Sequence, residues 1–426
     1  MSALTVAPDH RTLVRDGKPF FWLADTIWSA LTNVTDEEWI AYLDKRAAQG
    51  FTVLQLNALA QWDRCGCAFD RYPFVTLDHG KTFDFSSVND EYFEHARWMV
   101  GEAVARGLVP AIVVMWSNYV PDTWASAIIS DNVMPEQRVV PVVEKICSTF
   151  NEFEPVYIIS GDTDWDRPGS LERYRLVTSA VEDAAPRALL AYHIKGRYDV
   201  LPHELAEHAD VYLYQSGHNL AAQRGAYELA ESFLARDPVR PVINSEPCYE
   251  QMGYSHMLYG RFRRADVRLA CWRSLLAGAN AGITYGAHGI WNWQNPDVKV
   301  GNALGEGFLQ ALRHEQALYL EGANDFGFAR ELVEELGLFG ATSDQGVLES
   351  YPEDVRAART TDGRLVLYVP SNAALKLRGD LSGATVTCID LLSRERSVLL
   401  ARFDAEKDLT TVEQGTYLED AVYVIG

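Results

Sequence analysis

Eight short apolar segments, each separated from the next by a helical pattern, run through most of this chain and constrain its fold more than any other feature. They are rich in Val, Ile, Leu and aromatic residues, as strands buried on both faces are. Capping signals mark the helices between them: Thr35 and Glu38 form a capping box, and Gly50 ends the helix that follows. The expected strands cover residues 20–24, 51–57, 108–115, 156–159, 188–193, 209–215, 241–244 and 282–288.

Alternation of eight strands with helices is typical of a closed parallel barrel rather than of an open sheet. No Gly-x-Gly-x-x-Gly motif follows the first strand, which weakens the alternative of a dinucleotide-binding fold. We therefore predict an α/β fold, a (β/α)8 TIM barrel. Its later helices are expected at 91–106, 139–150, 171–184, 221–235, 261–277 and 305–319.

Smaller units are expected at both ends of the barrel. An Asp16-Gly17 turn predicts an N-terminal hairpin between residues 12–14 and 20–24. After residue 345 the pattern changes to short strands separated by turn signals, which predicts a small antiparallel β-sandwich. Its strands are expected at 355–360, 364–369, 384–390, 398–401 and 421–425. The predicted domains are 1–325 (hairpin and barrel), 326–345 (a junction) and 346–426 (the β-sandwich).

Composition limits the partners and the cellular compartment. The formal net charge of -21 argues against nucleic acid or an anionic membrane, because both bind basic surfaces. The first residues lack the basic start and apolar run of a signal peptide, and no apolar stretch reaches membrane-spanning length. Six cysteines are scattered without the spacing of a disulfide framework or a metal site. We therefore expect a cytoplasmic protein that needs no metal or cofactor.

Carboxylates follow two of the predicted strands at their C-terminal ends, where TIM barrels carry their active sites. Glu246 follows the seventh strand, and Asp162 and Asp164 follow the fourth. The loops after these strands lie across the barrel mouth from each other, so a pair of carboxylates suits glycoside hydrolysis with retention. Taken singly, Glu246 is equally well a loop cap, and Asp162 a turn aspartate that bonds its own backbone. Asp164 lies further from the strand and is the second candidate for the acid/base.

Aromatic and polar residues at other strand ends are candidates for sugar contacts. Indole rings stack on sugar faces, and polar side chains bond hydroxyl groups. Tyr214 at the end of the sixth strand is expected to donate a hydrogen bond to Glu246 and keep it ionised. The full set of candidate substrate contacts is Asp25, Asn57, Trp116, Asp164, His193, Tyr214, His218, His288 and Trp291.

Three motifs resemble the apiosidase-like family, glycoside hydrolase family 140. They are FWLADTIW at 21–28, RAAQGFTVLQLN at 46–57 and IISGD at 158–162. The resemblance spans roughly residues 8–320 and implies a TIM barrel followed by a small β-domain that resembles a collagen-binding domain. It also implies release of apiose from plant glycans, with Asp162 as acid/base and Glu246 as nucleophile. Related glycosidases carry Asn-Glu after the fourth strand, where this chain has Gly161-Asp162.

The sequence therefore predicts a retaining, exo-acting glycoside hydrolase that acts on a small oligosaccharide or glycoside. Members of the family tend to be exported, whereas this N-terminus predicts a cytoplasmic protein, which favours an imported oligosaccharide over a polymer. Two alternatives remain open: a non-catalytic carbohydrate-binding protein on a degenerate barrel, and a metal-dependent hydrolase or isomerase in which His193, His218 and Asp25 bind the metal. A homo-oligomer is compatible with all three.

Overall fold

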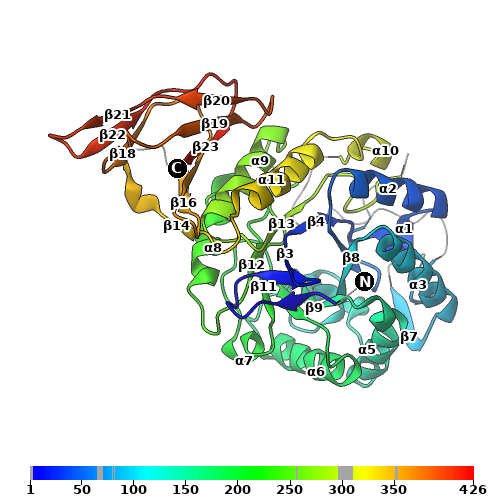
Figure 1. The fold of residues 1–426 in the computed structure, drawn as a ribbon. Coiled ribbons are helices and arrows are strands. Elements are labelled where there is room, and N and C mark those ends of the chain that lie inside the picture. The colour runs from blue at the N-terminus through cyan, green and yellow to red at the C-terminus, as the bar shows by residue number, and fades with distance from the viewer. Residues whose placement is uncertain are drawn as a thin grey trace.

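A closed barrel of eight parallel strands forms the larger part of the protein (Figure 1). The computed structural model describes residues 3–64, 71–78, 80, 82–255, 258–295, 310–350 and 354–426. The last barrel strand pairs with the first and closes the sheet, which confirms the TIM barrel. In chain order the strands are β4 (Trp22–Thr26), β5 (Val53–Asn57), β8 (Val109–Trp116), β9 (Val156–Gly161), β10 (Leu190–His193), β11 (Val211–Tyr214), β12 (Val242–Asn244) and β13 (Gly282–Tyr285).

Helices surround the barrel and cover its outer face (Figure 1). The longer ones are α2 (Asp36–Ala48), α3 (Asp90–Ala105), α5 (Glu136–Phe150), α6 (Pro168–Ala184), α8 (Gly225–Leu234), α9 (Arg264–Leu276) and α11 (Gly322–Leu336). The shorter segments are α1 (Ala30–Asn33), α4 (Trp124–Ile128), α7 (His203–Ala206), α10 (His314–Ala317), η1 (Ser117–Tyr119), η2 (Ser130–Asn132), η3 (Asn151–Phe153), η4 (Leu220–Ala222) and η5 (Gln345–Val347). None of the described helices is long and apolar enough to cross a membrane.

Local signals explain where several of these elements begin. The capping box of α2 forms as predicted: the Glu38 amide donates to Thr35 Oγ1 at 3.3 Å, and the Thr35 amide donates to Glu38 Oε2 at 3.0 Å. The helix expected at 305–319 differs. Its residues 305–309 lie outside the described part of the chain, and the described remainder is helical only over α10.

The N-terminal hairpin closes the end of the barrel at which the strands begin. It consists of β2 (Leu13–Arg15) and β3 (Lys18–Phe20), and β1 (Thr5–Val6) adds a third strand that was not predicted. Asp16 and Gly17 both have positive φ angles, 53° and 72°, as a tight hairpin turn requires. The predicted second strand of the hairpin is in fact two strands, because the chain leaves the hairpin after Phe20 and enters the barrel at Trp22.

Two antiparallel sheets form the C-terminal β-domain, as predicted. The first contains β14 (Thr342–Ser343), β16 (Arg356–Arg359), β17 (Leu365–Val369), β23 (Ala421–Ile425), β19 (Val386–Asp390) and β20 (Arg396–Leu399). The second contains β15 (Leu348–Ser350), β18 (Leu375–Arg378), β22 (Leu409–Val412) and β21 (Ala401–Asp404). The predicted strand at 398–401 is wrong, because the chain crosses between the sheets at Leu400.

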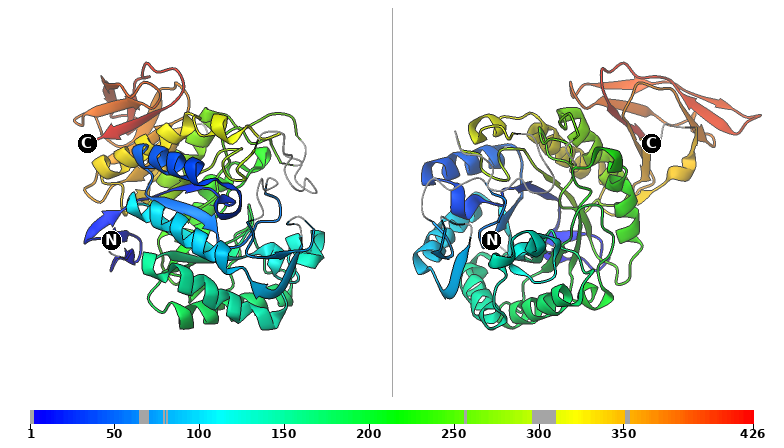
Figure 2. Two further views of the ribbon diagram at one scale, coloured as in Figure 1. Left: turned by 90° about the vertical axis from the view of Figure 1, so that its right-hand side faces the viewer. Right: turned by 180° about the vertical axis from the view of Figure 1, so that it is seen from behind.

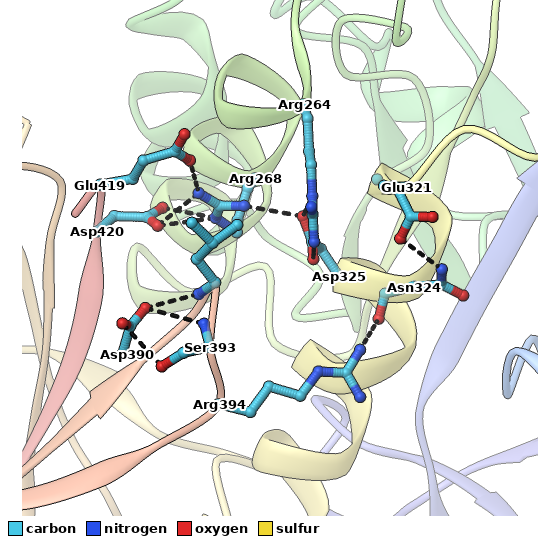
Figure 3. A network of polar contacts seen from close by, with 12 residues as sticks. Arg264, Arg268, Glu321, Asn324, Asp325, Asp390, Ser393, Arg394, Glu419 and Asp420 are labelled. Carbon is cyan, nitrogen blue, oxygen red and sulfur yellow. Dashed lines mark hydrogen bonds and ion pairs between the residues drawn. The ribbon is translucent and has the colours of Figure 1, made fainter. Parts of the chain in front are cut away.

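A buried charge network joins the β-domain to the barrel (Figure 3). Arg268 of α9 is 1% exposed and forms ion pairs with Asp325 of α11 at 2.9 Å and with Asp420 of the β-domain at 2.7 Å. Its guanidinium also contacts Glu419. Tyr368 of β17 donates its hydroxyl to Asp420 at 2.8 Å and stacks on Trp272 of α9. Every partner of Arg268 is therefore a carboxylate, and two of them come from the β-domain.

The β-domain lies against the outside of the barrel, next to α9 and α11. In the side view of Figure 2 it lies toward the same end of the barrel as the N-terminal hairpin. A second short hairpin, β6 (Phe74–Thr76) and β7 (Phe83–Val88), belongs to the loop after β5, at the opposite end. The N-terminal hairpin and the β-domain therefore leave the loops at the C-terminal ends of the barrel strands available for an active site.

Candidate active site

Glu246 follows β12, the seventh barrel strand, by two residues. The Ser245 amide donates to the carbonyl of Tyr214 at 2.9 Å, which extends the pairing of β12 with β11 by one residue. The amide of Gly217 donates to the carbonyl of Glu246 at 3.0 Å. Backbone bonds on both sides therefore hold the Glu246 side chain, which is 7% exposed, at the C-terminal face of the barrel.

Three side chains direct nitrogen atoms at the Glu246 carboxylate. His218 Nε2 lies 2.9 Å from Oε1, and Gln215 Nε2 donates to the same oxygen at 3.0 Å. His193 Nε2 lies 3.2 Å from Oε2. Burial favours the neutral acid, but these histidines more than offset it and lower the pKa of Glu246 to about 2. Glu246 is thus a buried carboxylate that stays ionised at neutral pH.

A polar layer beneath Glu246 orients His193. The Nδ1 atom of His193 lies 2.9 Å from the hydroxyl of Ser245, which in turn donates to the carbonyl of Tyr214. Inside the barrel, Gln55 Nε2 donates to the Ser245 carbonyl at 2.9 Å, and Thr284 donates to Gln55 Oε1 at 3.1 Å. These bonds connect β5, β10, β12 and β13 below the carboxylate, so the ring of His193 is positioned by several strands at once.

Tyr249 packs on the other side of the Glu246 cluster. Its ring centroid lies 4.5 Å from that of His218, and burial together with the charge of Glu246 raises the pKa of its phenol well above the usual value. Gly286, just past β13, makes room for this ring, since a Cβ there would lie 2.0 Å from Tyr249 Cδ1. Tyr249 is therefore the phenol that lies beside Glu246.

Asp162 is the first residue beyond β9, and its main-chain geometry is unusual. Its φ angle is 47°, and its carbonyl accepts a hydrogen bond from Trp124 Nε1 at 2.7 Å. The glycine before it has a steric reason, because a Cβ on Gly161 would lie 2.1 Å from the ring of Trp116. The Gly-Asp pair thus lets an indole cross the end of β9 while the chain turns Asp162 away from the strand.

Asp164 has a charged partner of its own. Its Oδ2 lies 2.8 Å from Lys195 Nζ, and the same ammonium lies 3.2 Å from Asp166. Asp164 is 5% exposed, so its own side of the ion pair is shielded from solvent. The Lys195 ammonium therefore already occupies one oxygen of the Asp164 carboxylate. Of the two aspartates after β9, Asp162 remains the better candidate for the acid/base.

An aromatic wall stands next to His193. The rings of Trp28 and Trp116 meet edge to face with centroids 5.2 Å apart. Their centroids lie 5.4 Å and 5.9 Å from the imidazole of His193. Trp28 follows β4, and Trp116 ends β8, so the two strands that flank β5 supply the wall. Such apolar faces can stack on a sugar ring.

The remaining predicted contacts lie at the same end of the barrel. Asn57 ends β5 and donates to Gln61 Oε1 at 3.5 Å. His288 follows β13, and its Nδ1 accepts a hydrogen bond from Trp291 Nε1 at 3.1 Å. The His288 and Trp291 rings are stacked with centroids 6.2 Å apart. All three side chains are buried, so they line the interior of the face rather than its rim.

Many buried polar atoms at this face have no hydrogen-bond partner among the described residues. Buried polar atoms are normally paired, so a local group of unpaired ones calls for an explanation. A ligand rich in hydroxyl groups would pair them. The group comprises Asn57 Oδ1, Trp62 Nε1, Asp63 Oδ1, Trp116 Nε1, Gln215 Oε1 and Asn292 Oδ1.

The structure corrects the expected role of Tyr214. Its hydroxyl donates to the carbonyl of Ala226 in α8 at 2.7 Å, and its ring stacks on Phe233 of the same helix. Tyr212 likewise points to the outside and donates to Pro238 at 2.7 Å. In β11 the even-numbered side chains therefore face the helices, and Tyr214 does not reach Glu246. Gln215 and His218, from the loop beyond, supply the donors instead.

Asp25 also points away from the other candidates. It is fully buried between β4 and α2, where it pairs with Arg46 and accepts a hydrogen bond from Tyr42 at 2.8 Å. Its carboxylate thus neutralises a buried guanidinium, so we leave it out of the proposed sugar contacts.

Sequence reasoning missed Gln215 and Gln55. Gln215 carried a usable signal, because it has the inward parity of Val211 and Leu213. Gln55 carried one as well, as a lone polar residue inside an apolar strand.

Among the described residues, no group of three or more His, Cys, Asp or Glu side chains is arranged to hold a metal ion. His193 and His218, two of the predicted metal ligands, both contact Glu246, and Asp25 pairs with Arg46.

Solved structures with the same fold cover nearly the whole chain. A glycoside hydrolase family 5 protein from Bacteroides vulgatus has a TM-score of 0.82 at 22% identity, covering 99% of this chain and 93% of that one. A structure described as a glycoside hydrolase has a TM-score of 0.81 at 20% identity, covering 99% of this chain and 96% of that one. At these identities the likeness shows a shared barrel and β-domain. None of the curated proteins matches the chain.

The family comparison is more specific than the structural one. Residues 7–340 match the family described as "Apiosidase-like, catalytic domain", which covers the barrel and α11. The match includes the loops that carry Asp162 and Glu246. The chain therefore belongs to the apiosidase-like family, and it is a glycoside hydrolase.

Proposed function

We propose that this protein is a retaining, exo-acting glycoside hydrolase of apiosidase type. Its substrate would be a plant-derived oligosaccharide or small glycoside, from which it releases a terminal pentofuranose or a related sugar. The observation that carries the proposal is the state of Glu246, a buried carboxylate with a pKa of about 2 on a barrel face where several buried polar atoms have no hydrogen-bond partner among the described residues.

The electrostatics support Glu246 as the nucleophile. A nucleophilic carboxylate must be ionised and partly shielded from water, and Glu246 satisfies both conditions. The same low pKa makes it unsuited to donate a proton at neutral pH. The proton donor must then be a second carboxyl group on the same face. We assign this role to Asp162, which follows β9, because Asp164 is paired with Lys195.

The proposed reaction has two steps. Asp162 protonates the oxygen of the leaving group while Glu246 Oε2 attacks the anomeric carbon, which forms a glycosyl-enzyme ester and breaks the glycosidic bond. Asp162, now a carboxylate, then removes a proton from water, and the water oxygen displaces Glu246 from the anomeric carbon. The aromatic wall of Trp28 and Trp116 would hold the sugar during both steps.

Charge favours a small neutral substrate. The chain carries a formal net charge of -21, and its site contains further carboxylates. An anionic polysaccharide would be repelled from such a surface, whereas a neutral glycoside would not.

The test combines product stereochemistry with chemical rescue. The wild type is assayed on 4-nitrophenyl pentofuranosides, pentopyranosides and hexosides, and NMR follows the anomer released first. We expect retention for the best substrate. Asp162→Ala should lose activity on that substrate, keep more of it on the matching 2,4-dinitrophenyl glycoside, and yield a glycosyl azide of retained configuration with sodium azide.

Glu246→Ala should instead give a glycosyl azide of inverted configuration. Asp164→Ala is the matched control, since this aspartate is two residues from Asp162 and is paired with Lys195. Release of the inverted anomer by the wild type would contradict the two-step mechanism. Rescue of Asp164→Ala but not of Asp162→Ala would transfer the acid/base role to Asp164.

A further inference from the structure

Asp63 lies in the loop after β5, six residues beyond the end of that strand, on the same face as Glu246. Its neighbours on both sides are anchored. Gln61 accepts a hydrogen bond from Asn57, and Trp62 packs edge to face on Trp124 with centroids 5.9 Å apart. Because Trp124 also bonds the carbonyl of Asp162, the loop that carries Asp63 is linked to the loop that carries Asp162.

No cation among the described residues forms an ion pair with Asp63. Arg64, next to it, turns away: its Nη2 donates to the carbonyl of Gly80 at 2.6 Å, and its guanidinium lies over the ring of Tyr72 at 5.3 Å. The other charged group that acts on Asp63 is Glu246. Asp63 Oδ1 is shielded from solvent and has no hydrogen-bond partner among the described residues.

This environment disfavours a second negative charge. Burial, with the charge of Glu246 adding to it, outweighs the hydrogen bonds from the Asp63 amide and Gln61 and the charge of Arg64, and raises the pKa of Asp63 to about 7. Two interacting carboxyl groups with widely separated pKa values divide their roles, because one stays ionised while the other keeps its proton. Glu246 is the ionised member. Asp63 is the member that can still donate a hydrogen bond below neutral pH, where an ionised carboxylate only accepts.

We propose that Asp63 is a specificity-determining residue, which meets the sugar bound against Glu246 as a neutral carboxylic acid and donates a hydrogen bond to one of its hydroxyl oxygens. This rests on the proposed glycosidase function and extends it. Its second oxygen can accept from a neighbouring hydroxyl, so one side chain would recognise two adjacent sugar hydroxyls. An asparagine has the same shape, one donor and one acceptor, and does not titrate.

The experiment compares Asp63→Asn with Asp63→Ala, and uses Asp131→Asn, at an exposed position of η2, as the matched control. kcat/KM is measured from pH 5 to pH 9 on the 4-nitrophenyl glycoside that the wild type hydrolyses fastest. At pH 5.5 we expect Asp63→Asn to stay within about threefold of the wild type, and Asp63→Ala to lose roughly 10- to 100-fold, the cost of one strong hydrogen bond. Above pH 7 the wild type should decline relative to Asp63→Asn.

A stability measurement reads the proton on Asp63 without any turnover. The folded-state pKa of Asp63 is raised, so its contribution is fully present below the unfolded pKa near 4 and is lost as pH rises through about 7. Asp63→Asn should therefore have a higher Tm than the wild type at pH 8.5, and the difference should shrink toward pH 4. Asp131→Asn should show no such trend.

A binding measurement separates this inference from the proposed function. D-apiose should raise the Tm of the wild type more at pH 5.5 than at pH 8.5, and that of Asp63→Asn equally at both. If the wild type hydrolyses none of the aryl glycosides but shows this pattern, the proposed activity fails and the role of Asp63 stands. Apiose stabilisation of the wild type that is equal at both pH values, or absent, overturns the role of Asp63. Loss of activity in Asp63→Asn at pH 5.5 that vanishes on the 2,4-dinitrophenyl glycoside also overturns it, since that pattern identifies a proton donor to the leaving group.

Discussion

Two buried clusters of charged side chains in this protein have opposite designs. Around Arg268, three carboxylates surround one guanidinium, and both oxygens of Asp420 accept hydrogen bonds from Arg268 Nε at 2.8 and 2.9 Å (Figure 3). Around Glu246, two histidines and a glutamine contact one carboxylate, and polar atoms nearby have no partner among the described residues. In the first cluster the buried charged groups are paired with one another, which is typical of a structural network. In the second, buried polar atoms lack partners, which is typical of a binding site.

The comparison predicts that changes in the Glu246 cluster affect activity, and that changes in the Arg268 cluster affect stability. The predictions below are ordered by the free energy that we expect each change to cost.

Glu246→Gln should have the largest effect. We expect kcat to fall by about 10⁴-fold or more, because loss of a nucleophile removes a step that no neighbouring group replaces. The Tm at pH 7 should also fall, because the amide lacks the charge that the histidines stabilise in the folded state. Steady-state kinetics and calorimetry on the same preparation measure both quantities. A loss of Tm without a loss of kcat would reverse our assignment of the two clusters.

Arg268→Met should cost about 3–5 kcal/mol of unfolding free energy, because it leaves Asp420 buried without its cation and removes one of the two guanidinium groups that pair with Asp325. Denaturant unfolding measures this loss. At a temperature where the variant is folded, its kcat on the best aryl glycoside should match that of the wild type. Arg396→Met is the control: Arg396 also joins the β-domain to α11 through Glu335 but is exposed, so it should cost about 1 kcal/mol or less. Equal losses from both variants would show that burial of the Arg268 network contributes nothing.

His218→Asn should lower kcat/KM by roughly 10- to 100-fold, the value of a hydrogen bond to a charged group. The pKa of Glu246 is held down by His193 and His218 to about 2, so removal of one histidine raises it. The acid limb of kcat/KM should therefore move to higher pH. Because the pKa of Glu246 is lower in the folded state, its ionised carboxylate stabilises the fold above the unfolded pKa of about 4.5, and this contribution is lost as pH falls toward 2. An unmoved acid limb would mean that another group controls it.

Asp164→Asn should have the smallest effect. Its ion pair with Lys195 is partly open to solvent on the lysine side, so we expect a loss of about 1 kcal/mol or less in stability and less than tenfold in kcat/KM. Parallel assays with Asp162→Asn check this. A loss of several orders of magnitude in Asp164→Asn would place it, rather than Asp162, among the reacting groups.

Local patterns along the chain were sufficient to predict the architecture. The alternation of apolar strands with helices, the capping box at Thr35 and the Asp16-Gly17 turn depend on interactions within a few residues, so they can be read without a fold. The position of Glu246 and Asp162 after the seventh and fourth strands followed from counting. The sheet crossing at Leu400 did not, because an unbroken apolar run gives no sign of which sheet each residue joins.

Contacts between distant elements were decided only in three dimensions. The sequence predicted that Tyr214 faces Glu246. In the structure the side-chain alternation of β11 directs its hydroxyl to the carbonyl of Ala226 in α8. Asp25 forms an ion pair with Arg46. The pKa of Asp63 depends on its burial and on the charge of Glu246, which is distant in the sequence. The direction of a side chain and the charge on a carboxyl group depend on which atoms surround it. Those atoms come from different strands and loops, and only the closed barrel brings them together.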